Sequence, residues 1–334
     1  MFSACLINSP SSDPGVYVKF KYRNEAALFD LGEIYRLQPR QILRVKYIFV
    51  SHTHMDHFIG FDHLLRICLG RDMHISLFGP PGFRKNVEGK LAAYTWNLVR
   101  NYTNDFSLRV TEISETEMTT AEYNCRRGFR PEKMTTDRFD GTLTGNNNFT
   151  VTGVFLDHRI PVLAFALKEH RHVNIMKNVL EEMHLPPGDW LMDLKDAVRR
   201  GESDDTPVTV RWKGGEKREV SLGELRKLTR ITGGQKIAYI TDTIYSADTA
   251  QKIVSLAKDS DILFIEAPFL EDDVQIATEK YHLTARQAGY LAGRAGVKNM
   301  RVFHLSPKYK GSEYRLENEA MDAFRASLSE NPQA

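Results

Sequence analysis

The chain of 334 residues is long enough for one large domain or two ordinary ones, and its 42% of hydrophobic residues is normal for a protein with a buried core. Its formal net charge of +2 is too small to establish a nucleic-acid partner, because phosphate binding depends on where basic side chains cluster. No apolar stretch approaches the length of a membrane-spanning helix, and the first residues lack the charged start of a secretory signal, so we expect a cytoplasmic protein with no membrane partner.

Short β-branched and aromatic runs alternate with helical patterns along the chain, which is typical of layered α/β proteins. A first helix is indicated by apolar residues that recur at helical spacing from Phe61 and stop at Gly70. A second helix is indicated by Thr284 and Gln287, which form a capping-box pattern, and by Gly296 at its end. The strand candidates are residues 45–50, 149–156, 160–168, 236–240, 262–265 and 300–303.

Residues 170–234 differ from the sequence on either side of them. They are rich in charge, contain Pro186-Pro187-Gly188 and Gly214-Gly215, and interrupt the strand pattern. An insertion of this length inside a compact fold is usually functional or mobile. We therefore expect a single domain, residues 1–334, with an arm inserted at residues 170–234.

The segment from Ser51 to His57 carries the strongest chemical signal in the sequence. It follows the buried strand predicted at 45–50, and we expect it to form a loop at the carboxyl end of that strand. Zinc-class ions prefer imidazole nitrogens combined with carboxylate oxygens, and two metals are needed to use all the candidate ligands. A polar loop with coincidental histidines is the alternative, and the density of the cluster argues against it. The candidate ligands in this segment are His52, His54, Asp56 and His57.

Three further candidate ligands, His158, Asp242 and His304, also follow apolar runs. If those runs are neighbouring strands, the three side chains converge on one edge of the sheet, where α/β folds usually place their sites. Each residue alone is weak evidence. A lone histidine is more often a hydrogen-bonded core residue, and Asp242 alone would be read as a cap for a helix near Ser246.

The order of these residues resembles the metallo-β-lactamase superfamily, and within it the ribonuclease Z branch, the endonucleases that mature tRNA 3′ ends. Three other stretches are similar to that branch: Ile-Glu-Ala-Pro at 265–268, His-Leu-Thr-Ala at 282–285, and Phe-His-Leu-Ser-Pro-Lys-Tyr at 303–309. Within the arm, residues 185–188 and 200–203 resemble the protruding tRNA-binding exosite of the family. The sequence departs from the branch at Ile265, Pro268 and Lys308, where histidine, threonine and arginine are usual.

The resemblance implies an α/β fold with four αββα layers and a centre of two Zn²⁺ ions, with Mn²⁺ or another divalent metal as an alternative. Asp30 would then be a supporting residue and not a ligand. By the same resemblance one zinc would be held by His52, His54 and His158, the other by Asp56, His57 and His304, and Asp242 would bridge them.

Our mechanistic hypothesis is in-line hydrolysis of a phosphodiester, in which a hydroxide that bridges the two metals attacks phosphorus. Asp56 would orient this hydroxide. His282, held by Glu266, would protonate the leaving 3′ oxygen as the general acid. Without the family pattern, His282 would be read as an ordinary residue before the cap at Thr284.

The leading functional hypothesis is an endoribonuclease that removes the 3′ trailer of precursor tRNA, with the arm gripping the folded tRNA by shape and phosphate contacts. The resemblance also implies a homodimer. One alternative is an enzyme of the same fold that hydrolyses a small phosphodiester, such as a cyclic nucleotide, or an ester. A second alternative is a catalytically silent RNA-binding or scaffold protein, which the complete set of candidate ligands argues against.

Overall fold

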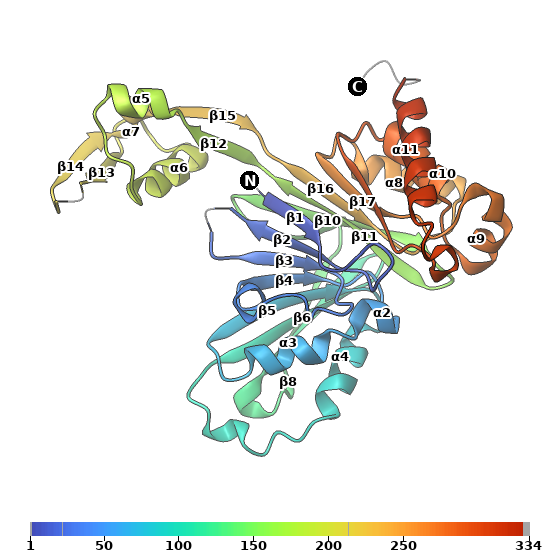
Figure 1. The fold of residues 1–334 in the computed structure, drawn as a ribbon. Coiled ribbons are helices and arrows are strands. Elements are labelled where there is room, and N and C mark those ends of the chain that lie inside the picture. The colour runs from blue at the N-terminus through green and yellow to red at the C-terminus, as the bar shows by residue number, and fades with distance from the viewer. Residues whose placement is uncertain (1, 22, 213, 330–334) are drawn as a thin grey trace. The chain divides into compact units, whose positions relative to one another are not determined.

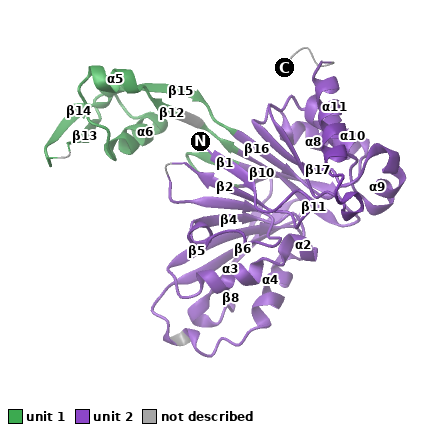
Figure 2. Cartoon of the chain, in the orientation of Figure 1, with its two compact units in different colours: residues 1, 144–150, 168–235 green, residues 2–143, 151–167, 236–334 purple. Residues whose placement is uncertain are grey.

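A computed structural model describes residues 2–21, 23–212 and 214–329 of the chain (Figure 1). The chain forms two compact units, shown in different colours in Figure 2. Unit 1 consists of residues 144–150 and 168–235, and unit 2 consists of residues 2–143, 151–167 and 236 onward. No helix in the described ranges has both the length and the apolar composition that a bilayer-spanning helix needs.

The first half of unit 2 is built on an eight-stranded sheet in the order β1-β2-β3-β4-β5-β6-β7-β8. Its central strands β3 to β6 run parallel, and the outer strands pair antiparallel. The strands are β1 (Phe2–Leu6), β2 (Val16–Phe20), β3 (Ala26–Phe29), β4 (Val45–Phe49), β5 (Met73–Gly79), β6 (Phe106–Ile113), β7 (Glu117–Asn124) and β8 (Pro131–Arg138). The helices of this half are α1 (Pro39–Ile42), α2 (Met55–Phe58), α3 (Phe61–Cys68), α4 (Phe83–Ala92) and the short η1 (Val99–Asn101) and η2 (Cys125–Arg127).

The second half of unit 2 is built on a six-stranded sheet in the order β18-β17-β16-β11-β10-β9, in which β16, β17 and β18 are parallel. Helices α8, α10 and α11 lie beside this sheet in Figure 1. The strands are β9 (Thr142–Gly145), β10 (Phe149–Asp157), β11 (Pro161–Glu169), β16 (Lys236–Ile240), β17 (Ile262–Glu266) and β18 (Met300–Phe303). The helices are α8 (Ala247–Ala257), α9 (Val274–Lys280), α10 (Ala285–Arg294), α11 (Tyr314–Ser329) and the short η4 (Glu271–Asp273) and η5 (Pro307–Tyr309).

Aromatic side chains join the two sheets of unit 2. Phe29 of β3 stacks on Tyr239 of β16 and on Phe165 of β11, with ring centroids 5.5 and 5.7 Å apart. Each sheet buries its other face against its own helices, because α3 and α4 contribute to one apolar core and α8, α10 and α11 to a second. These layers, helix, sheet, sheet and helix, are the αββα sandwich that the family resemblance implied.

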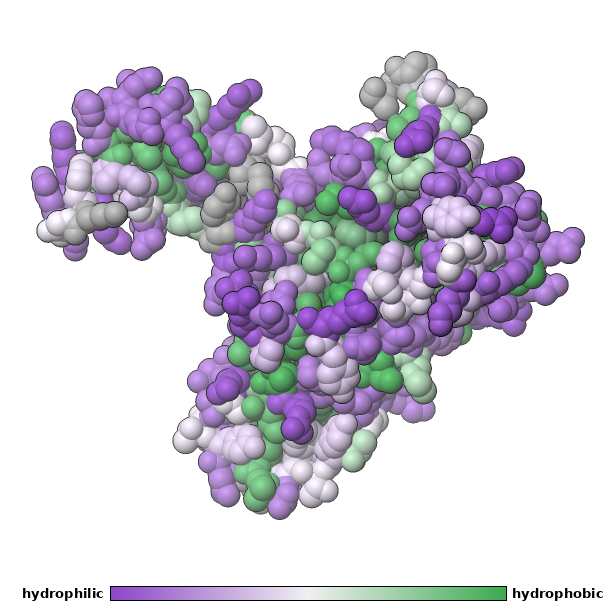
Figure 3. All heavy atoms as spheres, in the orientation of Figure 1, coloured by the Kyte–Doolittle hydropathy of each residue, from purple (hydrophilic) through white to green (hydrophobic). Residues whose placement is uncertain are grey.

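Unit 1 has a small core of its own around Trp190, which is fully buried and donates its indole N–H to the carbonyl of Pro186 over 2.8 Å. Hydrophilic residues dominate the face of this unit that Figure 3 shows. The sequence hypothesis that residues 170–234 act as an exosite-like arm stays a prediction. The elements of unit 1 are β12 (Arg171–Ile175), β13 (Pro207–Arg211), β14 (Lys217–Ser221), β15 (Thr229–Gly233), α5 (Lys177–Glu182), α6 (Trp190–Arg200), α7 (Leu222–Leu225) and η3 (Arg226–Leu228).

The local signals in the sequence correspond closely to the observed elements. All six predicted strands are present, within one residue at each end. Gly70 and Gly296 have positive φ just beyond α3 and α10, and Thr284 with Gln287 forms the expected capping box. The segment before α3 differs from the prediction of a simple loop, because residues 55–58 form the helical turn α2 with His54 as its N-cap residue.

Candidate metal centre

All the predicted ligands lie in unit 2, where strands of both sheets end. His52 follows β4, His158 follows β10, Asp242 follows β16 and His304 follows β18. Asp242 and His304 have left-handed backbone conformations, with φ of 40° and 57°. Non-glycine residues adopt this conformation at a cost, and such residues concentrate at functional sites, where the surrounding fold enforces them.

The side chains assemble into two adjoining groups. In each group the potential ligand atoms lie within 4.8 Å of one another. The first group consists of His52, His54, His158 and Asp242, and the second of Asp56, His57 and His304. These are the two sets that the family resemblance implied, although their role as ligands stays a prediction.

Asp242 lies between the two groups. Its Oδ2 is 3.5 Å from Nε2 of His52 and 3.7 Å from Nε2 of His158 on one side. On the other side, the same oxygen is 3.3 Å from Nε2 of His57, and Oδ1 is 2.8 Å from Nδ1 of His304. The carboxylate therefore occupies the position expected of a ligand shared by two ions.

The ring nitrogens fit divalent cations better than they fit hydrogen bonds. Nε2 of His52, Nε2 of His57 and Nδ1 of His304 are buried and lack a correctly oriented hydrogen-bond partner among the described residues. Buried polar atoms are normally satisfied, so three such atoms around one carboxylate need an explanation. Imidazole and carboxylate ligands in this number suit zinc-class ions, which would satisfy all three nitrogens.

Supporting residues fix which nitrogen of each ring faces the centre. Nδ1 of His57 is 2.7 Å from Oδ2 of Asp30, so Nε2 points toward Asp242. Asp30 is fully buried and also accepts hydrogen bonds from the backbone N–H of Ser51, its hydroxyl and the hydroxyl of Tyr239. These contacts suit the supporting role that the family resemblance implied for Asp30, and that role stays a prediction. Such partners orient metal-binding histidines and raise their basicity.

His158 is oriented by a contact that the sequence did not reveal. Its Nδ1 donates to the carbonyl of Tyr281, 2.8 Å away and 123 residues later in the chain. Arg159 reinforces this contact, because its guanidinium lies 4.8 Å from the Tyr281 ring and donates to the carbonyl of Glu279. Every residue has a backbone carbonyl, so no sequence pattern could have identified this acceptor.

The electrostatics of the cluster favour positive charge around Asp242. Burial and the neighbouring His57 lower the pKa of His52 to about 2, which leaves this imidazole neutral and able to bind a cation. Burial would also lower the pKa of His57, but the carboxylates of Asp242 and Asp30 outweigh it and raise that pKa to about 10. The pKa of Asp242 itself is held well below its ordinary value, against the effect of burial, by His304 and His57.

His282 and Glu266 lie beside the cluster as a hydrogen-bonded pair. Nδ1 of His282 is 2.8 Å from Oε2 of Glu266, whose other oxygen accepts from the backbone N–H groups of Thr243 and Leu283. Burial would lower the pKa of His282, but the Glu266 carboxylate raises it overall. The imidazole is therefore protonated over a wider pH range than an ordinary histidine, as a general acid needs.

A pocket of about 310 Å³ opens beside these residues, which we call the site pocket. One wall carries Asp56, His282 and His304. Among the remaining residues, Pro268, Leu305, Ser306 and Pro307 belong to the stretches that resemble the family, whereas sequence reasoning missed the other five, because a lone serine or lysine gives no signal of its own. The remaining residues are Ser11, Ser12, Asp13, Pro268, Phe269, Lys280, Leu305, Ser306 and Pro307.

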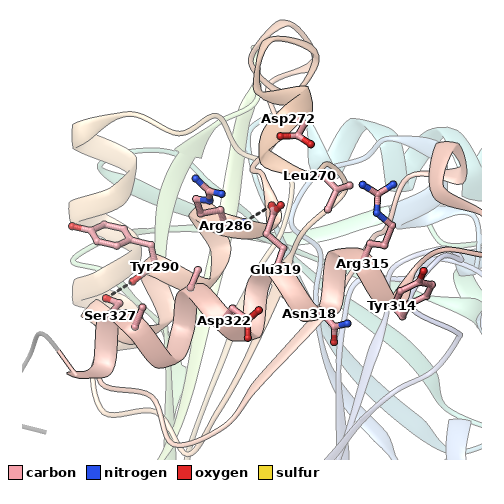
Figure 4. Close-up of a pocket in the computed structure, with 12 residues that line it drawn as sticks. Leu270, Asp272, Arg286, Tyr290, Tyr314, Arg315, Asn318, Glu319, Asp322 and Ser327 are labelled. Carbon is pink, nitrogen blue, oxygen red and sulfur yellow. Dashed lines mark hydrogen bonds between the residues drawn. The ribbon is translucent and has the colours of Figure 1, made fainter.

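A larger hollow of about 680 Å³ lies elsewhere in unit 2, between α10 and α11 (Figure 4). Its lining includes Arg286, Tyr290, Arg315 and Glu319, and none of the predicted site residues. Glu319 accepts a hydrogen bond from the backbone N–H of Arg286. The predicted site residues Asp56, His282 and His304 therefore line the smaller pocket and not this hollow.

Comparisons with known proteins identify relatives of this chain. Models of protein families give no match. A ribonuclease Z from Nostoc sp. is 31% identical over 301 residues, which span 88% of this chain and 78% of that protein.

Two solved structures share the fold. The metallo-β-lactamase fold protein YhfI from Bacillus subtilis has a TM-score of 0.55 at 14% identity, covering 96% of this chain and 92% of that one. The short form of human tRNase Z has a TM-score of 0.51 at 18% identity, covering 92% of both chains. The predicted metallo-β-lactamase fold is thus confirmed, and the sequence identity across most of both proteins shows that the chain belongs to the ribonuclease Z family.

Proposed function

We propose that this protein is a metal-dependent endoribonuclease that hydrolyses the phosphodiester between a tRNA and its 3′ trailer. The observation that carries the proposal is the meeting of seven potential ligands, Asp242 among them, from four separate segments of the chain. Relatives named ribonuclease Z and a neighbour named tRNase Z support the same reaction and substrate.

The residues of the cluster have separable roles. His52, His54 and His158 would hold one ion, Asp56, His57 and His304 the other, and Asp242 both. Two divalent cations in such a site lower the pKa of water to near neutrality and neutralise charge on a phosphate. Asp56 is partly exposed at the wall of the site pocket, where its carboxylate can orient the attacking water.

His282 completes the reaction as the proton donor. As the water oxygen bonds to phosphorus, the bond from phosphorus to the 3′ oxygen breaks, and the leaving oxygen takes a proton from His282. Glu266 keeps that imidazole protonated and holds its orientation through the 2.8 Å contact to Nδ1. Nε2 is then the nitrogen that faces the substrate.

A cleavage assay with a precursor tRNA, carried out with and without a chelator, tests the proposed function. We expect wild-type protein to release the intact trailer, to lose this activity in EDTA and to regain it with Zn²⁺ or Mn²⁺. Turnover of a small chromogenic phosphodiester with no cleavage of precursor tRNA would favour the small-substrate alternative. No turnover of either substrate after metal addition would favour a silent RNA-binding protein.

Three finer features belong to the same proposal. We propose two zinc ions per chain, a homodimer in solution and a location in the cytoplasm. Metal analysis of the purified protein, its mass by light scattering, and the position of a fluorescently tagged chain in cells test these features in turn. One ion per chain, a monomeric mass or a membrane-bound signal would each contradict the corresponding feature.

A further inference from the structure

The site pocket contains a cationic group with no role in holding metal. Lys280 is exposed at the end of α9, and its ammonium lies 5.6 Å from the centre of the Phe269 ring. Within the described ranges it makes no ion pair. Phe269 also lies close to His282, with the two ring centroids 6.1 Å apart. The ammonium and the imidazole therefore both lie next to the same aromatic ring.

The position of Lys280 is tied to the metal cluster by its neighbours. Tyr281, the next residue, has a left-handed backbone with φ of 59° and accepts the hydrogen bond from Nδ1 of His158. On the other side, the backbone N–H of Ala285 donates to the carbonyl of Phe269 over 2.7 Å. These bonds hold residues 280–285 against both the Phe269 loop and a predicted ligand. The backbone of Lys280 is therefore held in place beside the site.

The direction of the RNA through the pocket follows from the role of His282, so the inference rests on the proposed function. His282 protonates the leaving 3′ oxygen, and the nucleotide that carries this oxygen must lie on the side of the scissile phosphate that His282 faces. The part of the site pocket that Phe269 and Lys280 line adjoins His282, so we assign that part to the leaving-group side. The last nucleotide of the mature tRNA would occupy it.

That nucleotide is joined to the preceding one by another phosphodiester, which carries a full negative charge. We propose that Lys280 binds this phosphate, the one immediately 5′ of the scissile bond, and so sets the register of cleavage. A lysine suits the role because its flexible stem and compact charge can meet a phosphate without fixed geometry. The trailer would leave the site on the side away from Lys280.

Binding measurements without catalysis provide the first test. In EDTA, we expect Lys280→Met to weaken binding of precursor tRNA by about five-fold and to reduce the dependence of log Kd on log salt by about one unit. Lys280→Arg should restore most of the affinity. The matched control is Lys258→Met, an exposed lysine at the end of α8, which should bind like wild type. Unchanged affinity and salt dependence in Lys280→Met would overturn the proposal.

Chemical substitution of the RNA identifies which phosphate the lysine meets. We expect an uncharged methylphosphonate at the linkage 5′ of the scissile bond to lower kcat/KM of wild type by about five-fold, and to cause no further loss in Lys280→Met. The same replacement one linkage into the trailer should add to the effect of the variant. If instead the trailer replacement caused no further loss in Lys280→Met, Lys280 would contact the trailer phosphate. The RNA would then run in the other direction, and the proposed direction would be wrong.

The small chromogenic phosphodiester separates this proposal from the proposed function. It lacks a second phosphate, so wild type and Lys280→Met should hydrolyse it equally. Loss of this activity in the variant would show damage to the metal site and contradict a role in binding RNA. A wild-type protein that hydrolyses only this substrate would refute the tRNA function itself, whatever the result for Lys280.

Discussion

Asp242 combines two unusual properties in one residue. Its carboxylate faces four imidazoles from both ligand groups, and its backbone is left-handed. Asparagine tolerates this backbone and has nearly the same shape, so it removes the negative charge with little other change. Substitution of Asp242 is therefore the most direct test of whether two ions share one ligand.

We expect Asp242→Asn to lower the metal content and to reduce kcat by more than about 100-fold. Mutation of a residue that only supports a ligand already lowers metal affinity or activity by about 10- to 100-fold. Metal analysis and single-turnover kinetics on the same preparation measure both effects. Asp259→Asn is the matched control, since Asp259 is exposed and also has positive φ. A variant with full metal and undiminished rate would remove Asp242 from the centre.

The pair of His282 and Glu266 predicts how kcat depends on pH. The carboxylate raises the pKa of His282, so the general acid stays protonated, and active, to a higher pH than an ordinary histidine would. Glu266→Gln removes that effect, and the fall of kcat at alkaline pH should move to lower pH. A pH profile with an unshifted alkaline limb would show that Glu266 does not control the proton donor.

His282→Ala supplies the control for that profile. We expect it to lower kcat on precursor tRNA by about 100- to 10,000-fold, the usual contribution of a general acid, with full metal content. Hydrolysis of the chromogenic diester should change little, because its leaving group departs without a proton. Equal losses on both substrates would mean that His282 serves the site in some other way.

At the scale of elements, the helical turn α2 is positioned by close backbone packing. Gly32 lies against it, and a Cβ at this position would come within 2.5 Å of the carbonyl oxygens of Asp56 and Pro14. The backbone N–H of the neighbouring Leu31 donates to the carbonyl of His57. The segment that carries two predicted ligands is thus held by a contact that only glycine permits.

We expect Gly32→Ala to displace α2, to lower metal content and to reduce stability by about 1–3 kcal/mol, the usual cost of overpacking. Gly89→Ala, in the middle of α4, is the matched control, because a Cβ there meets nothing within 4 Å. That substitution should be neutral or slightly stabilising. Denaturant unfolding and metal analysis of both variants decide the matter, and equal behaviour of the two would refute the packing argument.

At the scale of the whole molecule, most of unit 1 can be deleted without cutting into unit 2. The backbone N–H of Met176 donates to the carbonyl of Leu228 over 2.8 Å, where the antiparallel ribbon of β12 and β15 ends. Replacing residues 177–227 by a short glycine linker would therefore keep the ribbon and remove the rest of the unit. The core of unit 1 is separate from the two cores of unit 2, so unit 2 should fold unchanged.

We expect the excised protein to keep its metal content and its activity on the small chromogenic diester. Its kcat/KM for precursor tRNA should fall by at least about ten-fold, mainly through KM, if unit 1 contributes RNA affinity as proposed. The unaltered chain is the reference for both substrates. An excised protein that cleaves precursor tRNA as well as the full chain would rule out the exosite role of residues 170–234.

The sequence by itself determined the features that depend on near neighbours in the chain. Local patterns of burial, helix capping and ligand density were enough to predict the strand at 236–240, the cap at Thr284 and the cluster that begins at His52. The same patterns could identify His158, Asp242 and His304 only as residues that follow apolar runs. The assumption that these runs are neighbouring strands, together with the resemblance to the family, joined them to the cluster.

Only the tertiary structure decided which distant groups orient the site. The carbonyl of Tyr281 on His158, the carboxylate of Asp30 between His57 and Tyr239, and the ammonium of Lys280 beside the pocket all depend on contacts between separate segments. Asp30 and Tyr239 are 209 residues apart in the chain. Such contacts arise from the packing of two sheets against each other, and a backbone carbonyl is the same in every residue, so one sequence carries no local pattern that reveals them.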